Sequence, residues 1–175
     1  MSASATARKL PRVDLRKFLD GGVAGRREAV ALVGDALREE GAVRVEGHGA
    51  VDSDGLVEVG IHMLAALADY FGLAPNAFAV GVASPAEGWS PEPEVLLVVL
   101  AGVPDGTELR AAGAGEWRPI TAHPGEIAAV PGAGLASLTG GVVPAAMVRW
   151  PEGATQAVAL SAPPGATLSA LPEFR

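Results

Sequence analysis

The pattern of apolar residues changes abruptly near Phe78, and this change constrains the fold of the 175-residue chain more than any other feature. Before it, apolar residues recur at helical spacing. After it, short apolar runs alternate with turns that contain Gly and Pro. Strands at such close intervals are typical of a β-sandwich or barrel. The sequence therefore predicts helices first and an antiparallel β half second, which is an α+β architecture.

Two helices are predicted before Phe78, with a strand between them. The first covers Arg26–Glu40, and Gly41 stands where a helix end favours a left-handed residue. Residues 42–46 then alternate with period two, which predicts a half-buried strand. The apolar stripe of this first helix consists of Val30, Val33 and Leu37.

The second helix is the longest predicted element. It begins near Ser53 or Asp54, either of which can cap it, and it ends before Gly72. Its predicted apolar stripe consists of Val57, Ile61, Leu64, Ala68 and Phe71. The predicted strands of the second half are Val95–Leu100, Glu108–Ala111, Trp117–Ile120, Ile127–Val130, Ala145–Trp150 and Ala157–Leu160.

The length of the chain favours one domain. Residues 1–8 are small and polar, and we expect a disordered tail there. Residues 9–175 then form a single domain, with a helical part over 9–78 and a β-rich core over 79–175.

Charge and composition exclude several function classes. The chain has 20 acidic and 13 basic residues, a net charge of -7, and its second half is acidic as well. Such a surface repels a phosphate backbone, so no nucleic-acid partner is expected. The absence of cysteine excludes disulfides and thiolate metal sites. No apolar run is long enough for a signal core or a membrane span, so we expect a cytoplasmic protein with no membrane partner.

Four stretches, in order, resemble the isopenicillin N synthase-like branch of the iron(II)/2-oxoglutarate-dependent oxygenases. They read PRVDL from Pro11, GAVRVEGHG from Gly41, ALADYFGLAPNAF from Ala66, and GEWRPI…PGEIAAVPG…LTGG from Gly115. The third stretch fits either of two helix ends of that family. The resemblance implies N-terminal helices packed on a double-stranded β-helix (jelly-roll, cupin-like) core, shortened here because the chain is shorter than usual for the family.

The positions that carry the family's chemistry differ in this sequence. The family holds iron with a His-x-Asp pair and a distal His, which leave open positions for cosubstrate and oxygen. Alignment of the motifs places Ser90 and Glu92 at the first pair and Val148 at the distal His. The family's Arg-x-Ser, which binds the 2-oxoglutarate carboxylate, falls near residues 155–158, where there is no Arg. The resemblance therefore predicts a degenerate member with no metal and no cofactor.

The three histidines do not suggest a replacement metal site. His48 lies in a Gly-His-Gly turn that the family keeps for structure, His62 can contact Glu58 one helical turn away, and His123 precedes a Pro-Gly turn. No two of them share a strand or a helix face, so we expect structural or solvated roles.

Four residues form the candidate site. Glu92 and Arg149 are the candidate catalytic residues, and Trp89 and Trp150 are the candidate binding residues, for an anionic or planar ligand. Glu92 and Glu94 flank Pro93, and in an extended segment both side chains would point to one side. One of them could then act as a general base in a barrel mouth. The alternative is that both belong to a solvated acidic loop. Core packing is the alternative role for each Trp. We expect Arg149 to pair with Glu92.

Two function hypotheses follow. In the first, the chain is a metal-free oxygenase-like protein of a bacterial biosynthetic pathway, repurposed for a non-redox cyclisation, isomerisation or elimination in the old pocket. In the second, it is a pseudoenzyme that binds a partner protein or acts as a scaffold. The expected partners are a small-molecule ligand or a pathway protein. A shortened jelly roll leaves open sheet edges, so a homodimer is expected too.

Overall fold

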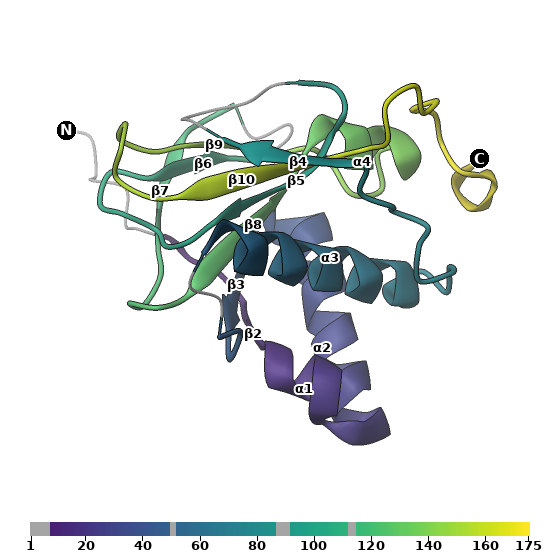
Figure 1. Ribbon diagram of the computed structural model, residues 1–175, viewed down its shortest axis with the longest axis horizontal. Coiled ribbons are helices and arrows are strands. Elements are labelled where there is room, and N and C mark those ends of the chain that lie inside the picture. Colours follow the sequence, from purple (N-terminus) through teal and green to yellow (C-terminus); the bar gives the residue numbers. More distant parts are fainter. Residues whose placement is uncertain (1–7, 50–51, 87–91, 112–114) are drawn as a thin grey trace.

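The computed structural model describes residues 8–49, 52–86, 92–111 and 115–175, and it places most helices before most strands (Figure 1). The helices are α1 (Leu15–Asp20), α2 (Gly22–Asp35), α3 (Ser53–Tyr70) and α4 (Ala133–Leu138), with a π-helical turn at Ala36–Glu40 and a 3-10 turn at Pro172–Phe174. The strands are β1 (Arg8–Lys9), β2 (Arg12–Asp14), β3 (Val43–Glu46), β4 (Val82–Pro85), β5 (Val95–Leu100), β6 (Glu108–Arg110), β7 (Arg118–Thr121), β8 (Ile127–Pro131), β9 (Met147–Arg149) and β10 (Ala157–Ser161).

The strands form two sheets. The larger sheet has the order β2-β3-β8-β5-β10-β4, and the smaller has the order β1-β7-β6-β9. Pairing is antiparallel except between β2 and β3 and between β1 and β7. Helix α3 packs against β5 and β10 on one face of the larger sheet (Figure 1). The predicted helices followed by an antiparallel β half are confirmed.

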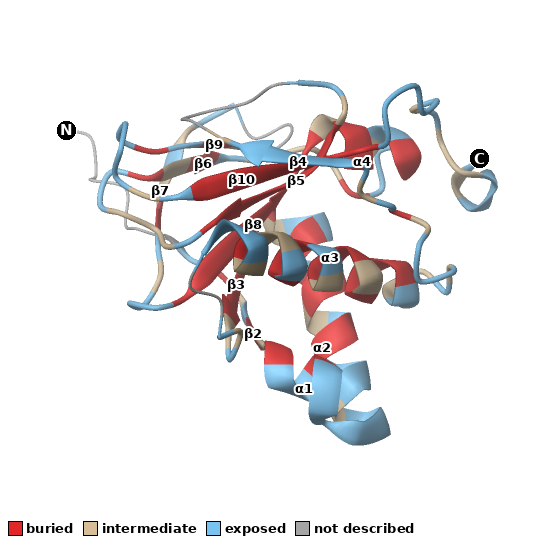
Figure 2. Ribbon diagram, viewed as in Figure 1, coloured by how far each residue is buried: buried red, intermediate tan, exposed pale blue. Residues whose placement is uncertain are grey.

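Both faces of the larger sheet are covered, and its central strand shows this most clearly. All six residues of β5 are buried (Figure 2). Leu97 and Val99 pack with the helices, whereas Val98 and Leu100 pack with side chains of the smaller sheet. Because successive side chains of a strand point to opposite faces, one apolar run supplies two separate cores.

The helix ends and the buried helix faces follow the predicted pattern, except for the N-terminal cap of α3 and the position of Ile61. Gly41 has a φ of +82° and ends the π-helical turn, as predicted. Helix α3, however, is capped by Asp52, whose side chain accepts a hydrogen bond from the Gly55 N–H, and not by Ser53 or Asp54. Ile61 is 46% exposed, because the buried face of α3 is centred elsewhere. That face consists of Leu56, Val59, Gly60, Met63, Leu64, Ala66, Leu67 and Ala68.

The N-terminal part differs from the prediction at its start. Arg8, assigned to the predicted tail, begins β1 and pairs with Ile120 of β7. The rest of the predicted tail, residues 1–7, lies outside the described residues. Among the described helices, none combines the length and apolarity needed to cross a membrane.

Candidate functional site

Val148, which the motif alignment places at the distal histidine, lies between the two sheets. It is 3% exposed, and its cross-strand neighbour is Leu109. The buried apolar side chains around it, which we call the inter-sheet cluster, come from both sheets and from the N-terminal segment. They are Leu10, Ala42, Val95, Val98, Leu100, Leu109, Ile120, Ala128, Val130, Val148, Trp150, Ala157 and Ala159. None of these side chains can ligate a metal ion.

The donor set of the described residues does not fit the iron that the sequence resemblance implies. Val148, which the motif alignment matches to the distal ligand, has no donor atom, and Glu92 lines a hollow elsewhere in the molecule. No group of three or more His, Asp or Glu side chains among the described residues could hold a metal ion. Ser90, at the remaining ligand position, lies outside the described residues, as does Trp89.

Arg149 points away from the inter-sheet cluster, on the outer face of the smaller sheet. Its guanidinium donates to Glu108 across the strand pair, with Nε 3.0 Å from Oε1. It also lies 4.0 Å from the centre of the Trp117 ring. The predicted pair of Arg149 with Glu92 is therefore wrong, because strand alternation turns Arg149 outward when Val148 is buried. The side chain is half-exposed, which makes this an ordinary surface contact.

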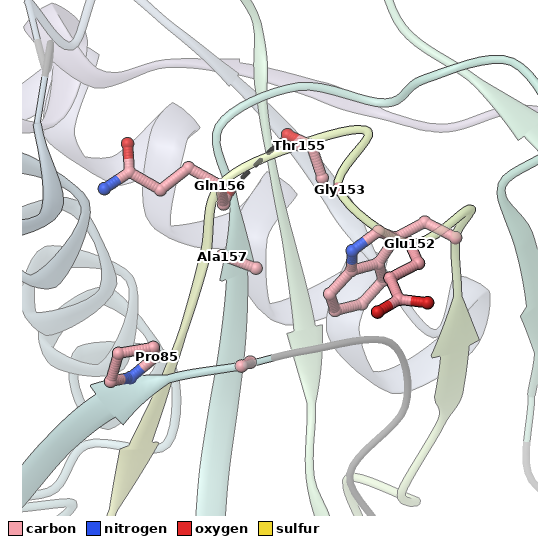
Figure 3. Close-up of a pocket in the computed structure, with 8 residues that line it drawn as sticks. Pro85, Glu152, Gly153, Thr155, Gln156 and Ala157 are labelled. Atoms are coloured by element: carbon pink, nitrogen blue, oxygen red, sulfur yellow. Dashed lines mark hydrogen bonds between the residues drawn. The ribbon is translucent and has the colours of Figure 1, made fainter.

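Trp150 belongs to the inter-sheet cluster and also lines a hollow of about 320 Å³ at the start of β10. Figure 3 shows Pro85 and Glu152 on opposite sides of it, with Ala157 between them. The Gln156 amide points away from Glu152 and donates to Ser53 Oγ. Among the described residues that line it, Glu152 alone is charged, and a carboxylate there does not favour an anionic ligand.

Glu92 and Glu94 line a second hollow, of about 370 Å³, beside β4 and the end of β10. We call this the acidic hollow. Glu92 and Glu94 were predicted to point to the same side of the chain, and both line this hollow. Contrary to expectation, however, the segment that carries them is not extended. It is a turn, in which the Val95 N–H donates to the Glu92 carbonyl oxygen at 3.2 Å.

The structure separates the three predicted site residues that it describes. Glu92 and Trp150 line different hollows, and Arg149 lies on the outer face of the smaller sheet. Trp89 is not among the described residues. The predicted site is therefore not assembled in the form that the sequence suggested.

A buried ion pair was not predicted from the sequence. Arg44 and Glu126 are each 4% exposed, and Arg44 Nη1 donates to Glu126 Oε1 at 2.8 Å. Arg44 Nε also donates to the Leu10 carbonyl oxygen at 2.7 Å, which ties the N-terminal segment to β3. Glu126 Oε2 is buried and has no hydrogen bond within the described part of the chain, although Arg12 Nη1 lies 3.7 Å from it.

The ionised form of Glu126 is favoured in the folded protein. Burial alone would raise the pKa of this carboxyl group, but hydrogen bonds from the His123 N–H and the Arg44 guanidinium outweigh burial, so the pKa is lowered. Glu126 Oε1 accepts both bonds, the one from His123 at 2.5 Å. The pair therefore remains charged at neutral pH and acts as a structural anchor.

The histidines have mainly structural contacts. His48 Nε2 lies 2.7 Å from the Gly125 carbonyl oxygen, which joins its turn to the one before β8. His62 lies 3.8 Å from Glu58 and packs edge-on against Phe18. The fold brings His48, Glu58 and His62 to one small hollow, which the sequence did not suggest, but their arrangement is not that of a metal site.

No family model matches the sequence, and no curated protein does so at a significant level. Solved structures match instead. A full-length Neurospora crassa protein, in complex with alpha-KG and 5-formyluracil, has a TM-score of 0.73 at 11% identity, over 99% of this chain and 92% of that one. The dioxygenase for auxin oxidation 1 of Arabidopsis thaliana, with 2-oxoglutarate, has a TM-score of 0.72 at 14% identity, over 95% and 99%.

A third match is shorter. A protein from Caulobacter crescentus assigned to the 2OG-Fe(II) oxygenase family has a TM-score of 0.57 at 19% identity, and the match covers 70% of this chain and 49% of that one. The present chain thus spans about half of that protein. The resemblance seen in the sequence motifs is confirmed at the level of three-dimensional structure. This chain has the double-stranded β-helix fold of the iron(II)- and 2-oxoglutarate-dependent oxygenases.

Proposed function

We propose that this chain is a metal-independent protein of the oxygenase fold, which acts by binding a small molecule or a partner protein and not by oxidation. The observation that carries the proposal is Val148, an aliphatic side chain that is buried in the inter-sheet cluster and that the motif alignment matches to the distal ligand. A facial iron site needs donor atoms there. Because Arg is also missing from residues 155–158, the family's partner for the 2-oxoglutarate carboxylate is lost as well.

Thermal unfolding with and without the family's metal and cosubstrate tests this proposal. A ligand that binds only the folded state raises the melting temperature, and the rise grows with the logarithm of the ligand concentration above its dissociation constant. We expect Mn²⁺ and 2-oxoglutarate, alone or together, to leave the melting temperature unchanged. A rise that requires both would show a working oxygenase site and would contradict the proposal.

A non-redox reaction in a bacterial biosynthetic pathway is the second candidate. It is favoured by the acidic hollow, where a Glu92 or Glu94 carboxylate could act as a base on a bound substrate. In this case Glu92→Gln would abolish turnover with little change in melting temperature. The reaction would take place at the hollow, because the inter-sheet cluster around Val148 is apolar and offers no acid or base.

A second copy of the chain is the proposed macromolecular partner. Strand β4 is an edge strand, all four of its residues are exposed, and Val82 is 42% exposed. Edges of this kind are commonly covered by association. Light scattering on a sizing column should give twice 17.6 kDa, and a mass of 17.6 kDa at micromolar concentration would contradict the homodimer.

A further inference from the structure

Three chain segments meet at the acidic hollow and are held together by backbone hydrogen bonds. The Gly81 N–H donates to the Ser161 carbonyl oxygen at 2.9 Å, and the Ala162 N–H donates to the Glu94 carbonyl oxygen at 3.0 Å. The start of β4, the entry to β5 and the end of β10 are thereby fixed side by side. The walls of the hollow are therefore part of the sheet framework.

All polar side chains that line the hollow can accept hydrogen bonds, because they are carboxylates or serine hydroxyl groups. Glu92 and Glu94 contribute two carboxylates, and no ion pair links either of them to a basic side chain within the described residues. Ser161 also lines the hollow and is 8% exposed. Across the described part of the chain its hydroxyl group has no hydrogen-bond partner, so it remains available to a ligand.

The remaining walls are mainly apolar, apart from Ser84. Their apolar residues include Val82, Pro163 and Leu168. Leu168 also packs against the hydrophobic core between the helices and the larger sheet. A volume of about 370 Å³ lies within the range of small-molecule sites, of about 300–1,000 Å³. The hollow therefore combines two negative charges and an available hydroxyl group with an apolar wall.

We propose that the acidic hollow binds a primary ammonium compound with an apolar body. An ammonium group has three N–H donors and no acceptor, so it can satisfy Glu92, Glu94 and Ser161 together. Its hydrocarbon part would lie on Val82 and Leu168. This inference rests on the proposed function in one respect, because both assume that the chain binds its ligand without a metal ion.

Titration of the isotopically labelled full chain with hexylamine hydrochloride, in buffer that contains a chelator, tests the proposal by NMR. The amide signals of Glu94, Ser161 and Ala162 should shift on binding. 1-Hexanol, which has the same chain without the charge, should bind at least about tenfold more weakly, or about 1.4 kcal/mol.

Paired variants locate the site. Glu92→Gln with Glu94→Gln should reduce hexylamine affinity about tenfold, to that of hexanol, because neutral amides lose the charge-assisted bonds. Glu116→Gln with Glu152→Gln removes the same charge elsewhere and should change affinity less than about twofold. Ser161→Ala, which leaves both charges in place, should reduce it by an intermediate factor.

Three outcomes would overturn the proposal. They are equal affinity for amine and alcohol, unchanged affinity in the Glu92/Glu94 variant, and amide shifts that cluster away from Glu94 and Ser161. A shift of these amides by magnesium chloride, added in buffer without chelator, but not by hexylamine would identify an inorganic cation site and would also overturn it. Because the titration contains no iron or 2-oxoglutarate, failure here leaves the metal-independence proposal standing, and the melting experiment tests that proposal separately.

Discussion

The environments of Val148 and Glu126 show how differently two parts of one barrel use their buried positions. Around Val148, which the motif alignment places at a metal-ligand position, the neighbours are aliphatic or aromatic. Around Glu126, where the sequence motif indicates only a turn before a strand, a buried charge pair with three direct hydrogen bonds joins β3, the entry to β8 and the N-terminal segment. The buried charge pair thus anchors the chain, and Val148 packs the two sheets together.

The largest effect is expected at the anchor. Glu126→Gln should destabilise the protein by about 3 kcal/mol, because it leaves the Arg44 guanidinium buried without its counter-ion. Urea unfolding followed by circular dichroism measures this change. The double variant with Arg44→Met should recover part of the loss, and a single-variant effect below about 1 kcal/mol would contradict the buried pair.

A smaller effect on stability is expected at Val148. Val148→His should cost about 2 kcal/mol, because an imidazole placed among aliphatic side chains lacks hydrogen-bond partners. The matched control is Val142→His, at a position 40% exposed, which should change stability by less than about 0.5 kcal/mol. If the Val148 variant were as stable as the wild type, the region around it would be wet or loosely packed.

The pH dependence of stability sharpens the comparison. The pKa of Glu126 is lower in the folded than in the unfolded chain, so its contribution is fully present above the unfolded value near 4.5. It is lost as the pH falls through the lower, folded value. Between pH 5 and pH 3 the wild type should therefore lose more stability than Glu126→Gln. Parallel losses in the two proteins would show that Glu126 is not the group responsible.

The smallest effect is expected on the outer face of the smaller sheet. Arg149→Met removes the ion pair with Glu108 and the stacking on Trp117, but both contacts are half-exposed. A change of about 0.5 kcal/mol is expected in urea unfolding. A loss of about 3 kcal/mol would place Arg149 in a buried network.

The sequence predicted elements well where periodicity was strong, and it predicted side-chain partners poorly. The strands Val95–Leu100 and Ile127–Val130 and the helix from Ser53 lie close to their predicted bounds. Helix α4 was missed, because six residues rich in Gly and Ala carry no clear helical period. The pairing of Arg149 depended on which face of β9 points outward, and a three-residue strand gives little signal for this.

Arg44 shows why the buried pair escaped prediction. It occupies the alternate position of the strand over residues 42–46, which in a half-buried strand points to solvent. In the folded protein the smaller sheet and the N-terminal segment cover that face, so the same position is buried. A signal existed in principle, since a strand covered on both faces requires a partner for any charge it carries.

The central claim is that this oxygenase fold has lost its metal chemistry. Elemental analysis of protein purified without chelator and then exposed to Fe²⁺ and 2-oxoglutarate, combined with an assay for succinate, tests it most directly. We predict far less than one metal ion per chain and no succinate above the protein-free control. About one iron per chain together with succinate formation would contradict the account.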